Sequence, residues 1–219
     1  MAETWGATPD WPGGDSFQTF GDVVDRATEM FRKEALPDPR NLAIRIYRAR
    51  RGPARYHAPL PDADELSPDE EVERVFDMLT EVAWGRPIAY SVGWTGFRNL
   101  AIYTDRRALI PRPETEGLVE LALARVRTGV AADIGTGSGA IALSLAQEGA
   151  FDQVIGCDLS REALVLARRN GRATGLKVSW RLGDLLAPLR GRPVDLLVSN
   201  PPYLSVLEYD ALDEMVRNW

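Results

Sequence analysis

The chain has 219 residues, of which 45% are hydrophobic, and a formal net charge of −6, which together suit one α/β core with a small second domain. No stretch reaches the roughly 20 apolar residues of a membrane span and no secretory signal opens the sequence, so we expect a cytoplasmic protein with no membrane partner. The acidic charge argues against tight direct binding to nucleic acid.

The first part of the chain predicts a small helical domain. Residues 1–16 are rich in Gly, Pro, Thr and Asp and indicate a flexible lead-in. Over residues 17–85, apolar positions at helical spacing predict three helices. Eight basic residues lie between Arg32 and Arg55, and they indicate either a solvated helix face or a patch for an RNA-bound or acidic partner.

The rest of the chain predicts a hairpin followed by an α/β domain. Residues 86–108, with the loosely alternating stretch "IAYSVGWTGFRNLAIYT", predict a hairpin linker. Residues 109–219 then alternate between helical and strand patterns, which predicts a doubly wound, mostly parallel Rossmann-like sheet. Four strands are expected, near residues 130–134, 153–157, 178–182 and 194–199. The last strand is apolar on both faces, so we expect the sheet to continue past Trp219.

A single cysteine and a single histidine limit the chemistry further. Cys157 ends an apolar run, which favours a small buried side chain over a reactive thiol. His57 has no other Cys or His near it in the sequence. We therefore expect neither a metal site nor a histidine-based triad.

A glycine-rich turn is the first candidate site. In "ADIGTGSGAIAL", Gly135, Gly137 and Gly139 follow a predicted strand and open a predicted helix, where a ligand can approach the backbone. With Ala140 the turn also fits the dinucleotide fingerprint, so a nicotinamide dehydrogenase is one interpretation. Asp158 lies 19 residues past Gly139 and suits a ribose hydroxyl in either case.

Two acidic residues help to separate the interpretations. Asp133, next to the glycine turn, would repel a pyrophosphate but would attract the ammonium group of a methionine-like ligand. Asp184 follows the third strand and could accept a hydrogen bond from an adenine amino group while Leu185 packs on the ring. Both therefore favour a ligand that joins adenosine to an amino acid.

The motif "NPPY" ends the fourth predicted strand, where open α/β sheets bind their ligands. Pro201 and Pro202 each fix a φ angle and hold the neighbouring carbonyls rigidly. The Asn200 side-chain oxygen and the Pro201 carbonyl could then accept both N–H bonds of a planar amino group, with Tyr203 as a flat apolar wall. Such a grip strengthens as the nitrogen becomes pyramidal, and so lowers the barrier to its attack on an electrophile.

Together with "GRPIAYSVGWTGF", "LIPRPETEGLVELAL" and "LSREALVLARRN", these motifs resemble the HemK/PrmC family of class I S-adenosylmethionine-dependent methyltransferases, which methylate a glutamine N5 of peptide chain release factors. The resemblance implies that the turn from Gly135 to Gly139, with Thr136, lines the methionine part of the cofactor, and that Asp133, Asp158, Asp184, Leu185 and Asn200 contribute to binding it. It also implies that Arg112 to Glu116 close over the cofactor, with Arg112 and Glu114 near the substrate. S-adenosyl-L-homocysteine would be the product, and the helical domain would grip the release factor.

Other functions stay open on the sequence alone. Adenine-N6 methyltransferases of nucleic acids share "NPPY" and would use it on a flipped base. A ribosomal protein could replace the release factor as the glutamine substrate. The resemblance implies several strands after "NPPY", so a chain that ends at Trp219 could also be a noncatalytic binding module.

Overall fold

The computed structural model describes residues 19–65 and 69–201. It divides between Val92 and Gly93 into two compact units. The predicted lead-in, residues 1–16, lies outside the described residues. None of the helices in the described ranges is long and apolar enough to cross a membrane.

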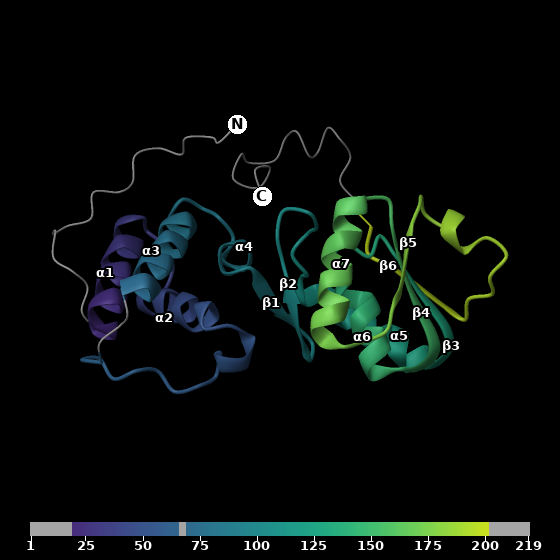
Figure 1. The fold of residues 1–219 in the computed structure, drawn as a ribbon, viewed down its shortest axis with the longest axis horizontal. Coiled ribbons are helices and arrows are strands. Elements are labelled where there is room, and N and C mark those ends of the chain that lie inside the picture. The colour runs from purple at the N-terminus through teal and green to yellow at the C-terminus, as the bar shows by residue number, and fades with distance from the viewer. Residues whose placement is uncertain (1–18, 66–68, 202–219) are drawn as a thin grey trace. The chain divides into compact units, whose positions relative to one another are not determined.

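The first unit is helical, as predicted (Figure 1). It contains α1 (Phe20–Lys33), α2 (Pro39–Arg50), the short 3-10 turn η1 (Pro53–Arg55), α3 (Asp69–Ala83) and α4 (Ile88–Val92). Apolar side chains at helical spacing, among them Val23, Phe31, Ile46 and Leu79, are completely or almost completely buried and form its core. Within the basic segment, Arg40 pairs with Asp25 at 2.5 Å on an exposed surface, which fits the solvated-face interpretation for that residue.

Helix α4 corrects the prediction for the start of the hairpin. The sequence pattern assigned residues 88–104 to extended structure, but Ile88–Val92 form one helical turn. The backbone N–H groups of Tyr90 and Ser91 donate to the Pro87 carbonyl at 2.9 and 3.2 Å. Ile88 and Val92, four residues apart and therefore on one helical face, both pack against the helical core, and this burial decides the local structure.

The second unit begins with the predicted hairpin, now shorter. Strands β1 (Trp94–Phe97) and β2 (Leu100–Tyr103) pair in antiparallel register. At its tip, Arg98 has a φ of +49°. The Arg98 guanidinium donates to both carboxylate oxygens of Glu148 at 2.6 and 2.7 Å, and its backbone N–H donates to Glu116 Oε1 at 3.0 Å. These contacts fix the hairpin to the two helices that carry the acidic residues.

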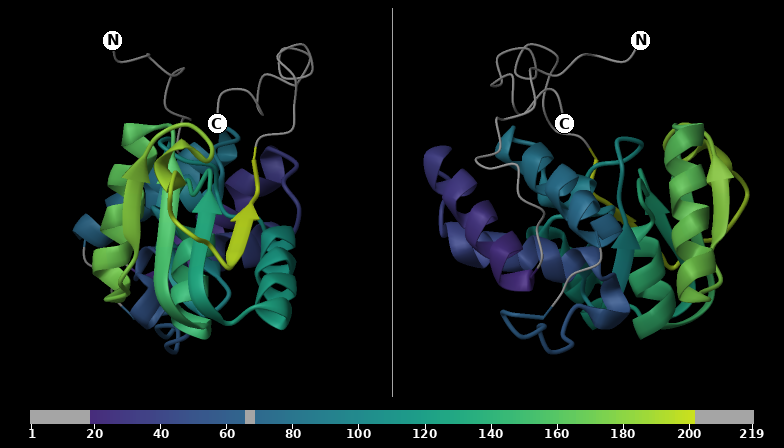
Figure 2. Two further views of the ribbon diagram at one scale, coloured as in Figure 1. Left: turned by 90° about the vertical axis from the view of Figure 1, so that its right-hand side faces the viewer. Right: turned by 60° about the vertical axis from the view of Figure 1, so that its left-hand side comes forward.

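The α/β part follows in the predicted order of elements. It comprises α5 (Pro113–Arg125), β3 (Thr128–Ile134), α6 (Ala140–Glu148), β4 (Ala150–Asp158), α7 (Arg161–Thr174), β5 (Ser179–Leu182), the 3-10 turn η2 (Ala187–Leu189) and β6 (Leu196–Ser199). Three parallel strand pairings join these strands into one sheet in the order β5-β4-β3-β6, and Figure 2 shows its strands side by side. The predicted fold class is confirmed.

The strand order positions the site. The chain moves outward from β3 through β4 to β5 and then returns across the sheet to β6, on the other side of β3. The direction of winding therefore reverses between β3 and β6, and a crevice is expected outside their carboxyl ends. Helices α6 and α7 pack on one face of the sheet. On the other face, Cys157 is buried with Ile134 and Ile155, as predicted for a small apolar side chain.

Candidate cofactor and substrate site

The glycine-rich turn joins β3 to α6. Gly135, Gly137 and Gly139 have φ values of +71°, +55° and +86°, a region that side chains with a Cβ rarely adopt. A Cβ on Gly135 would meet nothing within 4 Å, so the backbone is open to a ligand on that side. The Thr136 N–H donates to the Cys157 carbonyl at 2.8 Å and ties the turn to β4. The sequence therefore requires glycine here for backbone shape, as predicted.

Asp133, the residue before Ile134 in β3, is completely buried. Its Oδ2 accepts from Thr136 Oγ1 at 2.5 Å and from the Ala142 N–H at 3.1 Å. Gly139, the residue that caps α6, has no side chain to accept from the first turn of the helix, and Asp133 does so instead. Oδ1 has no hydrogen-bond partner among the described residues.

Burial raises the pKa of Asp133 to about 7, against the lowering effect of its hydrogen bonds from Thr136 and Ala142. The predicted direct approach of a ligand ammonium group thus meets a side chain with no exposed surface. Oδ1 of Asp133, which has no hydrogen-bond partner among the described residues, is buried as well, so the structure shows no surface at which the carboxyl group would meet the ammonium group directly.

Asp158 ends β4 and lies against the same turn. Its Oδ2 accepts from the Gly137 N–H at 2.8 Å, and its Oδ1 accepts from the Ser160 N–H at 2.9 Å. Ser160 caps α7, with its Oγ accepting from the Ala163 N–H at 3.1 Å. A carboxylate has about four acceptor positions, so Asp158 retains capacity for a ribose hydroxyl.

The segment after β5 lies beside Asp158. The Gly183 N–H donates to the Asp158 carbonyl at 3.0 Å, which brings the carboxyl ends of β4 and β5 together. Asp184 is exposed, and the Leu185 side chain is 65% exposed on a backbone with a φ of +42°. An exposed leucine held in this conformation is an apolar surface available to a flat ring.

Beyond the glycine-rich turn, the carboxyl end of β6 meets α5. Ser199 Oγ donates to the Ile134 carbonyl at 2.8 Å, so the end of β6 is fixed to the start of the glycine-rich turn. Asn200 Nδ2 donates to Thr115 Oγ1 at 3.1 Å. This bond joins "NPPY" to "PRPETE", two motifs 85 residues apart in the sequence. It also leaves Asn200 Oδ1, an acceptor, free of partners among the described residues.

Comparison with known proteins places the chain in a family. The methyltransferase small domain family matches residues 114–218. A release factor glutamine methyltransferase of Deinococcus radiodurans is 38% identical over 200 residues, which cover 90% of this chain and 71% of that protein. One of Rhodopirellula baltica is 34% identical over 232 residues, which cover 100% of this chain and 74% of that protein. The chain belongs to the release factor glutamine methyltransferase family.

Membership in this family confirms the resemblance, the transferase class and S-adenosylmethionine as the cofactor. The chain spans about half the length of six other release factor glutamine methyltransferases that it matches. Among solved structures, a ribosomal protein L11 methylase of Lactobacillus delbrueckii subsp. bulgaricus is 30% identical, with a TM-score of 0.39 over 48% of this chain and 62% of that one.

The residues present fit the cofactor of this family. The open backbone at Gly135, the remaining acceptor capacity of Asp158 and the exposed Leu185 offer a backbone cradle, an acceptor for hydroxyl groups and an apolar face. They lie at the carboxyl ends of the neighbouring strands β3, β4 and β5. That order matches an extended ligand with a charged amino-acid end and an aromatic end.

The roles of all the predicted site residues stay predictions. Arg112 and Glu114 are exposed at the beginning of α5, on either side of Pro113 and next to Thr115. Pro201 is exposed after β6, whereas Pro202 and Tyr203 lie outside the described residues. The sequence reasoning did not single out Thr115, although it lies inside "PRPETE", because nothing local indicates that its hydroxyl meets Asn200.

Trp180 was also missed. A Cβ on Gly139 would lie 2.8 Å from Trp180 Cη2, and one on Gly156 would lie 2.5 Å from Trp180 Cζ3. The indole of β5 therefore supports the glycine-rich turn from the side of the sheet, in space that only glycines leave open. Nothing in the sequence of this short, partly buried strand indicates that Trp180 packs against the glycines.

Proposed function

We propose that this chain transfers a methyl group to the side-chain amide nitrogen of a glutamine in a peptide chain release factor. The observation that carries the proposal is the hydrogen bond from Asn200 to Thr115. Because Nδ2 is the donor in that bond, Oδ1 is left to accept from an incoming N–H group. Substrates named for the relatives, at 34 to 46% identity, support a release factor.

The role that we assign to the "NPPY" corner is to align the substrate amide with the methyl group. The lone pair of an amide nitrogen is delocalised, so the amide is a poor nucleophile until the nitrogen becomes pyramidal. Asn200 Oδ1 and the Pro201 carbonyl would accept its two N–H bonds, and these bonds strengthen as positive charge develops on the nitrogen. Pro202 and Tyr203, by the family resemblance, would stiffen the corner and cover the planar face of the amide.

The cofactor would lie across the carboxyl ends of β3, β4 and β5. Gly135, Thr136, Gly137 and Gly139 would hold its amino-acid end, Asp158 its ribose, and Asp184 with Leu185 its adenine. When bound, S-adenosylmethionine supplies a methyl group made electrophilic by a sulfonium centre, with S-adenosyl-L-homocysteine as the product. The chain's own part is to orient the amide toward that group, and in this scheme no strong general base is needed.

The helical unit would dock the release factor, and Arg112 with Glu114 would contact substrate beside Asn200. The reaction would then belong to translation termination in the cytoplasm. A ribosomal protein as substrate and adenine-N6 methylation of nucleic acid are the alternatives within the same chemistry. A noncatalytic binding module would differ from all of these in leaving every acceptor unmethylated.

The test is transfer of a radiolabelled methyl group from S-adenosylmethionine to a release factor, to a version of it with the glutamine replaced, and to duplex DNA. We expect label on the first alone. Asn200→Ala should reduce kcat by about 100-fold or more, in the range of removing one transition-state hydrogen bond. Thr115→Val should reduce kcat less, by about tenfold, and leave the Kd for the cofactor unchanged.

Thr128→Val is the matched control, because Thr128 is exposed at the other end of β3. It should retain the original rate. Label on DNA, or an Asn200→Ala protein with the original kcat, would contradict the proposed function.

A further inference from the structure

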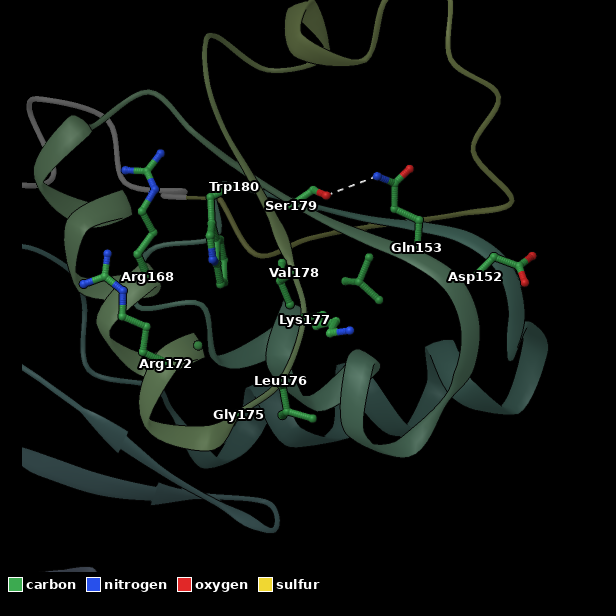
Figure 3. Close-up of a pocket in the computed structure, with 12 residues that line it drawn as sticks. Asp152, Gln153, Arg168, Arg172, Gly175, Leu176, Lys177, Val178, Ser179 and Trp180 are labelled. Atoms are coloured by element: carbon green, nitrogen blue, oxygen red, sulfur yellow. Dashed lines mark hydrogen bonds between the residues drawn. The ribbon is translucent and has the colours of Figure 1, made fainter.

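A second concave surface lies on the second unit, away from the carboxyl ends of the strands. It has a volume of about 790 Å³ and lies between the beginning of β4, the end of α7, and the segment that leads into β5 (Figure 3). Its lining includes Gln153, Arg168, Arg172, Lys177 and Trp180. We call it the β5-edge groove. It is open to solvent, which suits an extended ligand better than a small enclosed molecule.

The residues around the β5-edge groove carry a net positive charge, whereas the whole chain is acidic. The net charge of the whole chain is −6, yet residues 161–181 contain six Lys or Arg and one Glu. Arg168 and Arg172 are four residues apart on α7, so they project from one face of the helix about 6 Å apart. Figure 3 shows both beside Trp180, whereas Asp152, a carboxylate in the lining, lies at the opposite end.

These cations have no acidic partners in the described part of the chain. Arg168, Arg172 and Lys177 form no ion pair with any residue in ranges 19–65 and 69–201. By contrast, Arg169, adjacent in sequence, lies over the Tyr103 ring at 4.1 Å. Three free cations around one hollow create a local positive field that attracts anions.

Trp180 adds a fixed aromatic group to this field. Its indole is held between Gly139, Gly156 and Gly171, where added Cβ atoms would lie 2.5 to 3.5 Å from the ring. One side of the residue lines the groove. Cations that follow a backbone, next to an aromatic side chain, are the combination that single-stranded nucleic acid sites use.

We propose that the β5-edge groove binds the phosphate backbone of single-stranded nucleic acid. Guanidinium groups match phosphate geometry in a bidentate manner, and separate cations along a surface match evenly spaced phosphates. An acidic peptide would satisfy the cations but would bring no planar bases to Trp180. The binding is weak, because the chain's net negative charge opposes it and only three cations contribute.

The experiment is fluorescence anisotropy of a labelled 12-nucleotide uridine RNA titrated with the whole chain. A Kd on the order of 10 to 100 µM is expected at 50 mM salt. With about three phosphate contacts, log K should fall with log salt with a slope of about −2, so 200 mM salt weakens binding about 15-fold. A slope near zero would overturn the proposal.

The decisive variant replaces Arg168, Arg172 and Lys177 with Gln and should weaken binding at least fivefold. Its matched control, Arg45→Gln with Arg125→Gln and Arg190→Gln, changes the net charge equally at exposed positions outside the groove. Control binding should stay within twofold of the original. Equal losses in both triple variants, or equally tight binding of polyglutamate, would overturn the assignment. Cofactor binding should persist in both variants, which separates this test from that of the methyl transfer.

Discussion

Replacing Asp133 with Asn should abolish most of the pH dependence of stability between pH 5 and 7. The pKa of Asp133 is raised by burial from 3.8 to about 7. A carboxyl group whose pKa is higher in the folded chain binds more protons when folded, so it stabilises the fold at low pH and loses that contribution as pH rises through about 7. The shift of about three units corresponds to about 4 kcal/mol at high pH, of which about 2 kcal/mol is lost between pH 5 and 7.

The Asn side chain has the same shape as a protonated carboxyl group and its oxygen can still accept from Thr136 and Ala142. The excess of the variant's free energy of unfolding over that of the original chain should therefore grow by about 2 kcal/mol between pH 5 and pH 7. Urea titrations followed by circular dichroism at pH 5, 6, 7 and 8 measure this difference. Asp152→Asn, an exposed replacement, controls for the change in net charge. Parallel pH curves for the original and Asp133→Asn chains would refute the reasoning.

Two further changes test the packing that holds the site. Gly139→Ala should lower the free energy of unfolding by about 2 to 4 kcal/mol and weaken cofactor binding, because its Cβ would lie 2.8 Å from Trp180 on a backbone with φ of +86°. Gly175→Ala, at φ +71° with nothing within 4 Å, should cost only about 1 kcal/mol in the same urea titration, and equal losses would refute the contact. Glu148→Gln should make the free energy of unfolding depend less on pH in the acid range. The reason is that the hydrogen bond from Arg98 lowers the pKa of Glu148 from its ordinary value of 4.5. The original chain should then lose about 1 to 2 kcal/mol more than this variant between pH 6 and 3, and identical acid limbs would contradict the role of the pair.

The elements of the α/β part could be predicted from the sequence because their signals are local. Glycine at three positions of one turn has a single physical reason, positive φ, and the structure has it at Gly135, Gly137 and Gly139. Alternating strand and helix patterns predict a parallel sheet, because two parallel strands need a crossover connection between them, which is usually a helix. The cap of α7 at Ser160 is likewise a side chain acting on its own helix.

The features that were missed depend on contacts between distant segments. Helix α4 forms where alternation was expected, because Ile88 and Val92 gain burial in a core built by other helices. Asp133 caps α6 from a neighbouring strand, so its burial and raised pKa could not be inferred from its place before the glycines. Trp180 meets three glycines from three elements, and only the packed sheet brings them together.

The stiffness of the "NPPY" corner and the direction of its amide have different origins. The prolines restrict the backbone by their covalent structure alone, so this part of the design can be inferred from the sequence. They do not determine which atom of the Asn200 amide faces the crevice. In the structure Nδ2 donates to the hydroxyl of Thr115, which α5 places there from 85 residues away, and Oδ1 has no partner among the described residues. Under the proposed function, the prolines of "NPPY" would hold the backbone of the corner and Thr115 of "PRPETE" would occupy Nδ2 of Asn200, so the two motifs would act together in presenting Oδ1 to the substrate.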